Sequence, residues 1–219
     1  MASASRLLCN QPAQCQRSVV DVDAIILAGG KGSRLGGADK SALVGPDGRT
    51  TLERTILACR EVDAKRVVVV GPPATLSAVD VEVTQEQPPG SGPALAIAAG
   101  LALLNSDPSD DSDVLVLACD MPNAGPGVKA LLAAQSGVDG VLGVADGQRQ
   151  WLLGLYKRAA LAGACGDLAN WVGAGNPSVR YLLSGLDLAE VVVPASTADD
   201  IDTPEDLNRL QYRKGENNE

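Results

Sequence analysis

The stretch Ile25-Ile26-Leu27-Ala28-Gly29-Gly30-Lys31-Gly32-Ser33-Arg34-Leu35-Gly36-Gly37-Ala38-Asp39-Lys40 decides how this chain folds. Residues 24–28 are apolar with no helical period, which predicts a buried strand. The loop that follows carries five glycines and three cations, Lys31, Arg34 and Lys40. Glycine lacks the Cβ atom that would keep a ligand away from the backbone, so successive N–H groups can converge on phosphate oxygens while the cations supply charge. The stretch therefore predicts a polyphosphate-binding loop at the end of a strand.

Two better-known phosphate-binding loops do not match this stretch. A P-loop requires glycine directly before its Lys-Ser/Thr pair, whereas Asp39 precedes Lys40-Ser41 in this chain. The dinucleotide fingerprint requires a third glycine at the position that Leu35 occupies. The remaining alternative is a glycine-rich strand-to-helix turn with solvated charges, although three cations beside one strand end are unusual for an inert turn.

The length and composition of the chain indicate one domain with a sizeable core, since 45% of its 219 residues are hydrophobic. We expect a flexible N-terminal extension over residues 1–21, a single domain over 22–212 and a C-terminal tail over 213–219. The sequence contains neither a membrane-spanning apolar run nor the apolar core of a secretion signal, which favours a cytoplasmic protein. A formal net charge of −9 disfavours nonspecific binding to nucleic acids or membranes.

The chain contains no histidine, and this absence narrows the possible chemistry. It excludes Ser-His and Cys-His nucleophilic pairs and any metal site with histidine ligands. Five scattered cysteines without a Cys-x-x-Cys spacing also argue against a disulfide framework and against a zinc site. The remaining carboxylates, lysines and arginines suit phosphate chemistry that depends on positioning and on a metal ion.

Strand-like and helix-like segments alternate along the chain. The predicted strands cover residues 23–28, 66–70, 79–84, 114–119, 138–144, 151–157 and 189–194. The predicted helices cover residues 51–62, 93–105, 126–136, 158–168, 177–186 and 204–211, and the fifth is expected to use Asn176 as its N-cap and Pro177 in its first turn. This alternation predicts an α/β fold with a mostly parallel central sheet.

Acidic residues follow two of these predicted segments where ligands usually bind, outside the carboxyl ends of the strands. Asp120 ends the strand over 114–119, and a carboxylate there could hold Mg²⁺ against bound phosphates, because Mg²⁺ takes only one or two protein oxygens. Asp120 could equally be a turn former before Pro122.

A second group of acids, Asp199, Asp200 and Asp202, precedes the last predicted helix. The simplest interpretation is a helix start, with Asp202 or Thr203 as the N-cap and Pro204 in the first turn. Capping needs only one of these residues, so another could complete a metal site with Asp120. Asp202 is the first choice for this ligand and Asp200 the second.

Four motifs occur in a recognisable order along residues 22–212: Leu27 to Lys40, then Gly92-Pro93-Ala94-Leu95, then Cys119-Asp120-Met121-Pro122, then Asp202-Thr203-Pro204-Glu205-Asp206-Leu207. Together they resemble the molybdenum cofactor guanylyltransferase family, within the nucleoside-triphosphate transferase superfamily. The resemblance implies a Rossmann-like three-layer sandwich. It also implies an Mg²⁺-dependent enzyme that moves GMP from GTP to molybdenum-molybdopterin and releases pyrophosphate.

The resemblance further implies three sets of site residues. Contacts with the nucleotide are implied for Leu27, Ala28, Gly29, Gly30, Lys31, Gly32, Ser33, Arg34, Gly37, Lys40, Glu86 and Gly92. Catalytic roles are implied for Arg34, Lys40 and Asp120, and Mg²⁺ binding for Asp120 and Asp202. The pterin acceptor would lie near Asp146, Arg149, Asp200 and Asp202.

The chain also departs from the family pattern. Family members often carry Asn-x-Asn-Thr-Pro where this chain has Asp200-Ile201-Asp202-Thr203-Pro204, and Gly71 appears where the family has an asparagine. Three alternative functions therefore stay open: a cytidylyltransferase acting on the same pterin, a sugar-phosphate nucleotidyltransferase, and a nucleotide-binding module without catalysis. We expect a monomer or a weak homo-oligomer.

Overall fold

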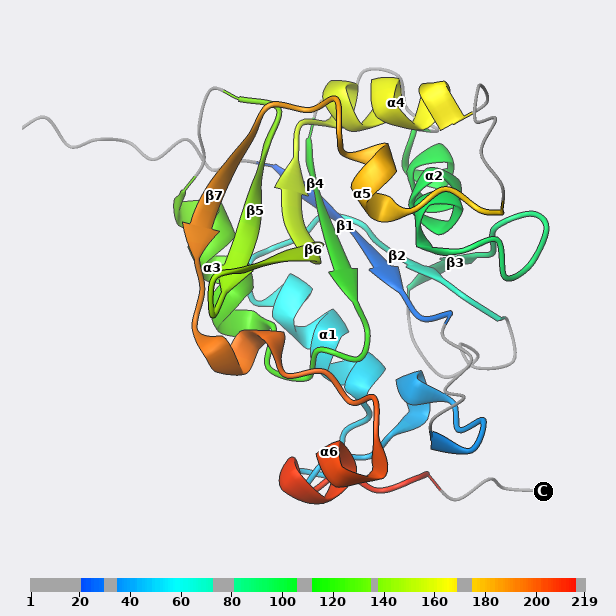
Figure 1. Ribbon diagram of the computed structural model, residues 1–219, viewed down its shortest axis with the longest axis vertical. Helices are drawn as coiled ribbons and strands as arrows, with labels where there is room; N and C mark the ends of the chain where they lie inside the picture. Colours follow the sequence, from blue (N-terminus) through cyan, green and yellow to red (C-terminus); the bar gives the residue numbers. More distant parts are fainter. Residues whose placement is uncertain are drawn as a thin grey trace, which may run out of the picture.

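The computed structural model describes residues 21–29, 35–72, 81–105, 112–134, 138–168 and 175–215. Within these residues, seven strands form one sheet in the order β3-β2-β1-β4-β6-β5-β7 (Figure 1). The strands are β1 Val22–Leu27, β2 Val67–Val70, β3 Glu82–Thr84, β4 Asp113–Ala118, β5 Gly140–Ala145, β6 Gln148–Tyr156 and β7 Leu188–Val192. All neighbouring strands are parallel except that β6 runs antiparallel to β4 and β5. The prediction of a mostly parallel sheet is confirmed.

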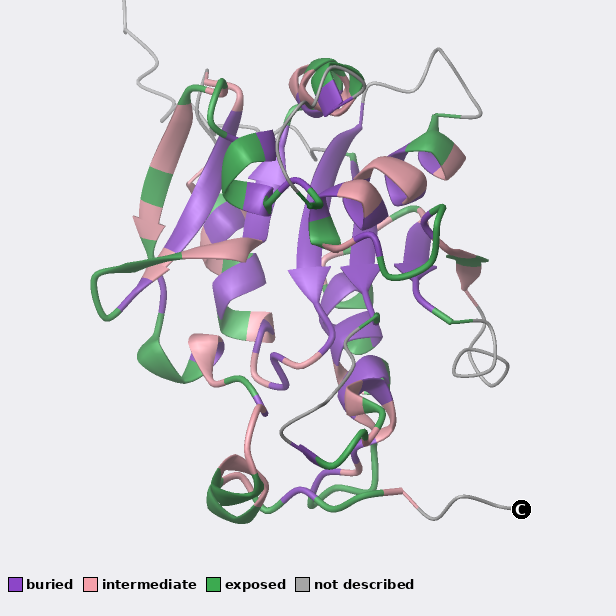
Figure 2. Cartoon of the chain, turned by 45° about the vertical axis from the view of Figure 1, so that its right-hand side comes forward, coloured by how far each residue is buried: buried purple, intermediate pink, exposed green. Residues whose placement is uncertain are grey.

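Helices cover both faces of this sheet. They are α1 Thr51–Arg60, α2 Pro93–Leu104, α3 Gly125–Ala133, α4 Arg158–Asp167, α5 Val179–Leu182 and α6 Pro204–Arg209. One core lies between the sheet and α1 and α3, and a second lies between the sheet and α2, α4 and α5. Strand β1 shows why two cores form, because Ala24 and Ile26 face the first and Ile25 and Leu27 face the second. Figure 2 shows that the buried residues gather in the central strands.

A third, smaller core joins the C-terminal part of the chain to the segment that follows the glycine-rich loop. It contains Leu35, Leu43, Ile201 and Tyr212. The backbone N–H of Arg213 donates to the carbonyl of Val44 at 2.9 Å, and the N–H of Val44 donates back at 2.8 Å. As a result, α6 and its flanking segments lie beyond the carboxyl ends of β1 and β4, at the bottom of Figure 1.

A buried ion pair lies at the other end of the central strands, near the start of β1. Asp23 of β1 is 0% exposed, and a guanidinium nitrogen of Arg158, itself 8% exposed, lies 2.5 Å from its carboxylate. Arg158 also donates to Asn105, and the backbone N–H of Arg66 donates to Asp23. The two buried charges are therefore paired and hydrogen-bonded, as burial in a protein interior requires. None of the helices in the described ranges is long and apolar enough to cross a membrane.

The predicted bounds of most elements lie within a few residues of those observed, but the predicted helix over 177–186 was wrong. Helix α5 spans only four residues, Val179–Leu182, and Pro177 lies before it. Its N-cap is Ser178, whose hydroxyl accepts from the N–H of Tyr181 at 3.1 Å, in place of the predicted Asn176. A serine hydroxyl satisfies the orphan N–H groups of a first turn as well as asparagine does, so the helix begins two residues later than the sequence pattern indicated.

Candidate active site

The carboxyl ends of β1 and β4 lie side by side and bring two predicted motifs together. Leu27, the last residue of β1, pairs with Ala118, the last residue of β4. One residue further, the N–H of Cys119 donates to the carbonyl of Leu27 at 3.0 Å. The glycine-rich loop and the Asp120 motif therefore leave the sheet from the same place, as the parallel topology predicted.

At this place Lys40 binds two carboxylates that are far apart in sequence. Its ammonium donates to Asp120 at 2.7 Å and also to Asp202. Lys40 opens the short 3₁₀ helix Lys40–Ala42, whose N-cap Asp39 accepts from the N–H of Ser41 at 2.9 Å and from its hydroxyl at 2.6 Å. The two predicted metal ligands and the predicted catalytic lysine thus meet at one point.

Burial and neighbouring charges set the ionisation of this cluster. Burial alone would lower the pKa of Lys40, but the hydrogen bonds and charges of Asp120 and Asp202 outweigh it and raise the pKa above its ordinary value. Partial burial, then the charges of Asp202 and Asp120, raise the pKa of Asp200. Asp200 therefore lies within electrostatic range of the same two carboxylates. Two carboxylates bound to one ammonium leave a net negative charge, which favours a further cation.

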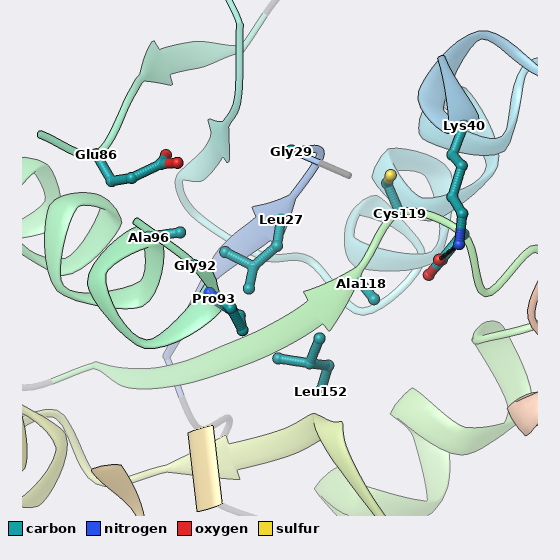
Figure 3. A pocket seen from close by; sticks show the side chains of 11 residues that line it. Leu27, Gly29, Lys40, Glu86, Gly92, Pro93, Ala96, Ala118, Cys119 and Leu152 are labelled. Carbon is teal, nitrogen blue, oxygen red and sulfur yellow. Dashed lines mark hydrogen bonds and ion pairs between the residues drawn. The ribbon is translucent and has the colours of Figure 1, made fainter. Parts of the chain in front are cut away.

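A cavity of about 210 Å³ opens beside this cluster (Figure 3). It is bounded by the ends of β1 and β4, by β6, by the loop before α2 and by the first turns of α2. The residues that line it are Leu27, Gly29, Lys40, Glu86, Gly92, Pro93, Ala96, Ala118, Cys119, Asp120 and Leu152. Six of them were predicted site residues, namely Leu27, Gly29, Lys40, Glu86, Gly92 and Asp120. The fold thus gathers five of the seven described residues of the predicted nucleotide site, together with Asp120, around one cavity.

Two polar features face this cavity from the side opposite Lys40 (Figure 3). Glu86 is 7% exposed, and one of its carboxylate oxygens accepts from the N–H of Gly90 at 2.8 Å, which fixes the loop that Glu86 begins. Gly92, with a φ of +91°, is the N-cap of α2, and Pro93 takes the first helical position. The first turn of a helix presents unpaired N–H groups, so this wall favours a negatively charged or acceptor-rich ligand.

The donor set of the cluster fits Mg²⁺. Asp120 and Asp202 offer carboxylate oxygens only, and both already face one cationic nitrogen, that of Lys40. In the described ranges no three His, Cys, Asp or Glu side chains are placed to hold a metal ion by themselves. A site with two carboxylates therefore needs phosphate and water oxygens to complete it, which is the usual arrangement for Mg²⁺ at nucleotide sites.

Five residues of the predicted nucleotide loop, Gly30, Lys31, Gly32, Ser33 and Arg34, lie outside the described residues.

Two other predicted nucleotide residues are described but do not line the cavity. Ala28 is buried directly after β1, and Gly37, with a φ of +80°, has open space where a Cβ atom would lie. The roles predicted for these two residues and for the five outside the described ranges stay predictions.

The structure does not bring Asp146 and Arg149 into the cavity. Asp146 and Gly147 form the tight turn between β5 and β6, with φ angles of +48° and +72°, and Asp146 is exposed. The guanidinium of Arg149 donates to Glu190 of β7 at 2.6 Å and lies 5.6 Å from the ring centroid of Trp151. Because β6 runs antiparallel to β4, this hairpin lies at the same end of the strands as the cavity. An acceptor role for either residue stays a prediction.

Leu152 is a cavity residue that the sequence reasoning missed. The pairing of β5 with β6 shifts between Leu142 and Gly143, whose partners are Gly154 and Gln150, so residues 151–153 have no partner in β5. This irregularity lets Leu152 reach the cavity (Figure 3). No local pattern signals such a shift, because it depends on the fit between two strands. Cys119, the residue before Asp120, also lines the cavity.

Comparison with solved structures supports the fold assignment. Molybdopterin-guanine dinucleotide biosynthesis protein A from Archaeoglobus fulgidus superimposes with a TM-score of 0.63 at 21% identity, covering 86% of this chain and 96% of that one. The 4-diphosphocytidyl-2C-methyl-D-erythritol synthase from Anaerococcus prevotii gives a TM-score of 0.63 at 16% identity, covering 88% and 97%. At these identities the likeness concerns the fold, and it confirms the predicted Rossmann-like three-layer sandwich.

Comparison of sequences identifies the family. The probable molybdenum cofactor guanylyltransferase of Mycobacterium avium (strain 104) is 30% identical over 191 residues, which cover 85% of this chain and 93% of its own length. The molybdenum cofactor guanylyltransferase of Acidiphilium cryptum (strain JF-5) is 32% identical over 139 residues, covering 63% and 67%. A family model described as the MobA-like NTP transferase domain matches residues 24–191. The chain therefore belongs to the family of MobA-like NTP transferase domains.

Proposed function

We propose that this member of the family moves GMP from GTP to molybdenum-molybdopterin and releases pyrophosphate, as a step of molybdenum cofactor biosynthesis. The observation that carries the proposal is the meeting of Lys40, Asp120 and Asp202 beside a cavity at the carboxyl ends of β1 and β4. Curated relatives that match most of the chain are named "Probable molybdenum cofactor guanylyltransferase". We further propose a cytoplasmic protein, monomeric or weakly homo-oligomeric, whose single domain covers residues 22–212.

The transfer is a direct substitution at phosphorus. A terminal phosphate oxygen of the acceptor attacks the α-phosphorus of GTP in line; a new P–O bond forms there, and the bond to the β-phosphate oxygen breaks. The attacking phosphate is already anionic near neutral pH, so no strong base is needed, which agrees with the absence of histidine. The raised pKa of Lys40 keeps its ammonium charged, so that Lys40 can neutralise the departing pyrophosphate.

Within this proposal Asp120 and Asp202 would hold Mg²⁺, and Asp200 is an exposed acid within electrostatic range of both. When bound, Mg²⁺ would neutralise charge on the phosphates. Arg34 is proposed as the second cation of the nucleotide loop. The acceptor would approach from the side of Asp200 and of the hairpin that carries Asp146 and Arg149.

The two ends of the cavity suggest how a nucleotide lies in it. Lys40 and Glu86 line opposite sides (Figure 3), so the phosphates would lie beside the ammonium and the base beside the carboxylate. One oxygen of Glu86 is bound to the N–H of Gly90, and the carboxylate retains lone pairs for a ligand. Guanine offers two neighbouring donors, its ring N–H and its amino group, which match a carboxylate. Cytosine has only its amino group, and this difference supports GTP over CTP.

Thermal unfolding with Mg²⁺ and each of GTP, CTP, ATP and UTP tests the nucleotide. A ligand at about a hundred times its dissociation constant adds roughly 2.7 kcal/mol of stability, which is a readable shift in Tm. Selective stabilisation by GTP, followed by pyrophosphate release when molybdenum-molybdopterin is added, is the expected result. Selectivity for CTP would transfer the assignment to a cytidylyltransferase. Binding without pyrophosphate release would favour the non-catalytic module.

A further inference from the structure

Two buried threonines lie one turn apart on the same face of α1 and contact the backbone on both sides of the active site. Thr51 is 0% exposed and Thr55 is 1% exposed. The hydroxyl of Thr51 donates to the carbonyl of Lys40. The hydroxyl of Thr55 lies 3.0 Å from the carbonyl of Thr51 and 3.4 Å from the carbonyl of Cys119, so its proton is shared between them. Through these contacts, one helix holds the two backbone segments from which Lys40 and Asp120 extend.

Neither hydroxyl is needed to start the helix. Thr50 is the N-cap of α1 and forms a complete capping box with Glu53, at 3.1 Å and 2.7 Å. The capping box does not use the N–H of Thr51, and this N–H donates to the carbonyl of Leu43 at 2.9 Å. The bond from the Thr51 hydroxyl to Lys40 is therefore additional. Together the two bonds of Thr51 fix both ends of the 3₁₀ turn that carries Lys40.

The second segment is fixed in a similar way from two directions. The N–H of Cys119 is bound to the end of β1 at 3.0 Å, and its carbonyl faces the hydroxyl of Thr55. The next residue is Asp120, whose carboxylate accepts from Lys40 at 2.7 Å. The position of the Lys40 ammonium relative to the Asp120 carboxylate thus depends on α1, because both backbone segments are bonded to this one helix.

We propose that Thr51 and Thr55 are positioning residues that set the ammonium of Lys40 against the carboxylate of Asp120. This inference rests on the proposed nucleotidyl transfer. Neither threonine touches the cavity, so each acts only through the backbone it holds. Loss of a hydroxyl therefore leaves the nucleotide contacts in place but lets the two charged groups drift from the geometry that the transition state needs.

The test uses paired variants at each position, Thr51→Val and Thr51→Ser, and Thr55→Val and Thr55→Ser. Valine keeps the shape and removes the hydroxyl, whereas serine keeps the hydroxyl. We expect each valine variant to lower kcat about three- to tenfold, the worth of one hydrogen bond, with little change in KM for GTP. The serine variants should recover most of kcat. Thr197→Val is the matched control, because Thr197 is equally buried and its hydroxyl has no partner among the described residues.

A double-mutant cycle with Lys40→Met separates positioning from general destabilisation. If Thr51 acts through Lys40, Thr51→Val should have no further effect on kcat in the Lys40→Met background. Equal effects in both backgrounds, or equal effects of valine and serine, would overturn the inference while the proposed function stands. A wild-type protein that neither binds GTP nor releases pyrophosphate would overturn the proposed function first, and the inference with it. Should the wild type bind GTP without releasing pyrophosphate, the proposed transfer is overturned, and the inference, which concerns kcat, falls with it.

Discussion

The ammonium of Lys40 lies 2.7 Å from a carboxylate oxygen of Asp120, although 80 residues separate them in the sequence. The contact exists because the glycine-rich loop and the Asp120 motif leave neighbouring parallel strands at the same level. The pair lies at the carboxyl ends of these strands, where a polyphosphate can bind. Its two members would interact with phosphate in different ways. Lys40 can bind phosphate oxygens directly, whereas Asp120 can do so only through a metal ion.

Replacing Asp120 with asparagine should abolish most of the transfer and keep the fold. Asparagine has the same shape and can still accept from Lys40, but it lacks the charge that a metal ion requires. We expect kcat to fall on the order of 10²- to 10³-fold, the usual cost of one lost transition-state contact. Pyrophosphate release is the measurement, and Asp187→Asn, an exposed change of the same kind, is the control. Unchanged kcat in the Asp120 variant would remove Asp120 from the catalytic set.

Replacing Lys40 with methionine should change how the protein responds to Mg²⁺ alone. In the wild type the ammonium occupies the point that both carboxylates face, so a metal ion must compete with it. Without the ammonium, Asp120 and Asp202 repel each other, and a divalent cation relieves that repulsion. We therefore expect a larger Mg²⁺-induced rise in Tm for Lys40→Met than for the wild type. A rise that stays the same or becomes smaller would show that these carboxylates do not bind the ion.

The part of this site that could be predicted from sequence is the part encoded locally. The apolar run before Gly29 and the strand before Asp120 each carry their own signal, and the parallel topology then places their ends together. The contact between Lys40 and Asp202 has no local signal. It depends on Ile201 and Tyr212 packing against the segment after the loop, in a core too small to produce a periodic pattern.

Two other differences have physical causes that a single sequence does not display. The choice of Ser178 over Asn176 as the N-cap of α5 reflects which side chain can reach a free N–H once the helix is packed. The position of Leu152 depends on a shift in pairing between two strands. In both cases tertiary packing selects among local options that the sequence leaves nearly equal.

Breaking the buried pair of Asp23 and Arg158 should cost far more stability than breaking a surface pair. With Arg158→Met, the carboxylate of Asp23 stays buried and keeps the N–H of Arg66 but loses the guanidinium of Arg158, which lies 2.5 Å from it. The free energy of unfolding in urea should fall by about 3–5 kcal/mol. Lys129→Met is the control, because the pair of Lys129 with Glu61 is exposed and should contribute less than about 1 kcal/mol. Equal losses in the two variants would mean that water reaches Asp23.

The stability of the C-terminal segment should depend on pH through Asp206. Its carboxylate accepts from Thr203 and forms the capping box of α6. The hydrogen bond from Thr203, followed by that from Arg209, holds the pKa of Asp206 at about 2, below its ordinary value of 3.8. Because the folded pKa lies below the unfolded one, the contribution is present above pH 4 and is lost as the pH falls toward 2.

Urea unfolding at pH 5 and near pH 2 measures this contribution as a difference between wild type and Asp206→Asn. The difference in free energy of unfolding should be small but positive at pH 5, since Asp206 is largely solvated, and should shrink near pH 2. Asn208→Gln, a change in the same helix that removes no carboxylate, should show no such dependence. If the difference between wild type and Asp206→Asn stays constant over this range, the capping box does not act through the ionised carboxylate. The attachment of the segment that carries Asp202 would then depend on the small core around Ile201 and Tyr212 and on the backbone bonds between Val44 and Arg213.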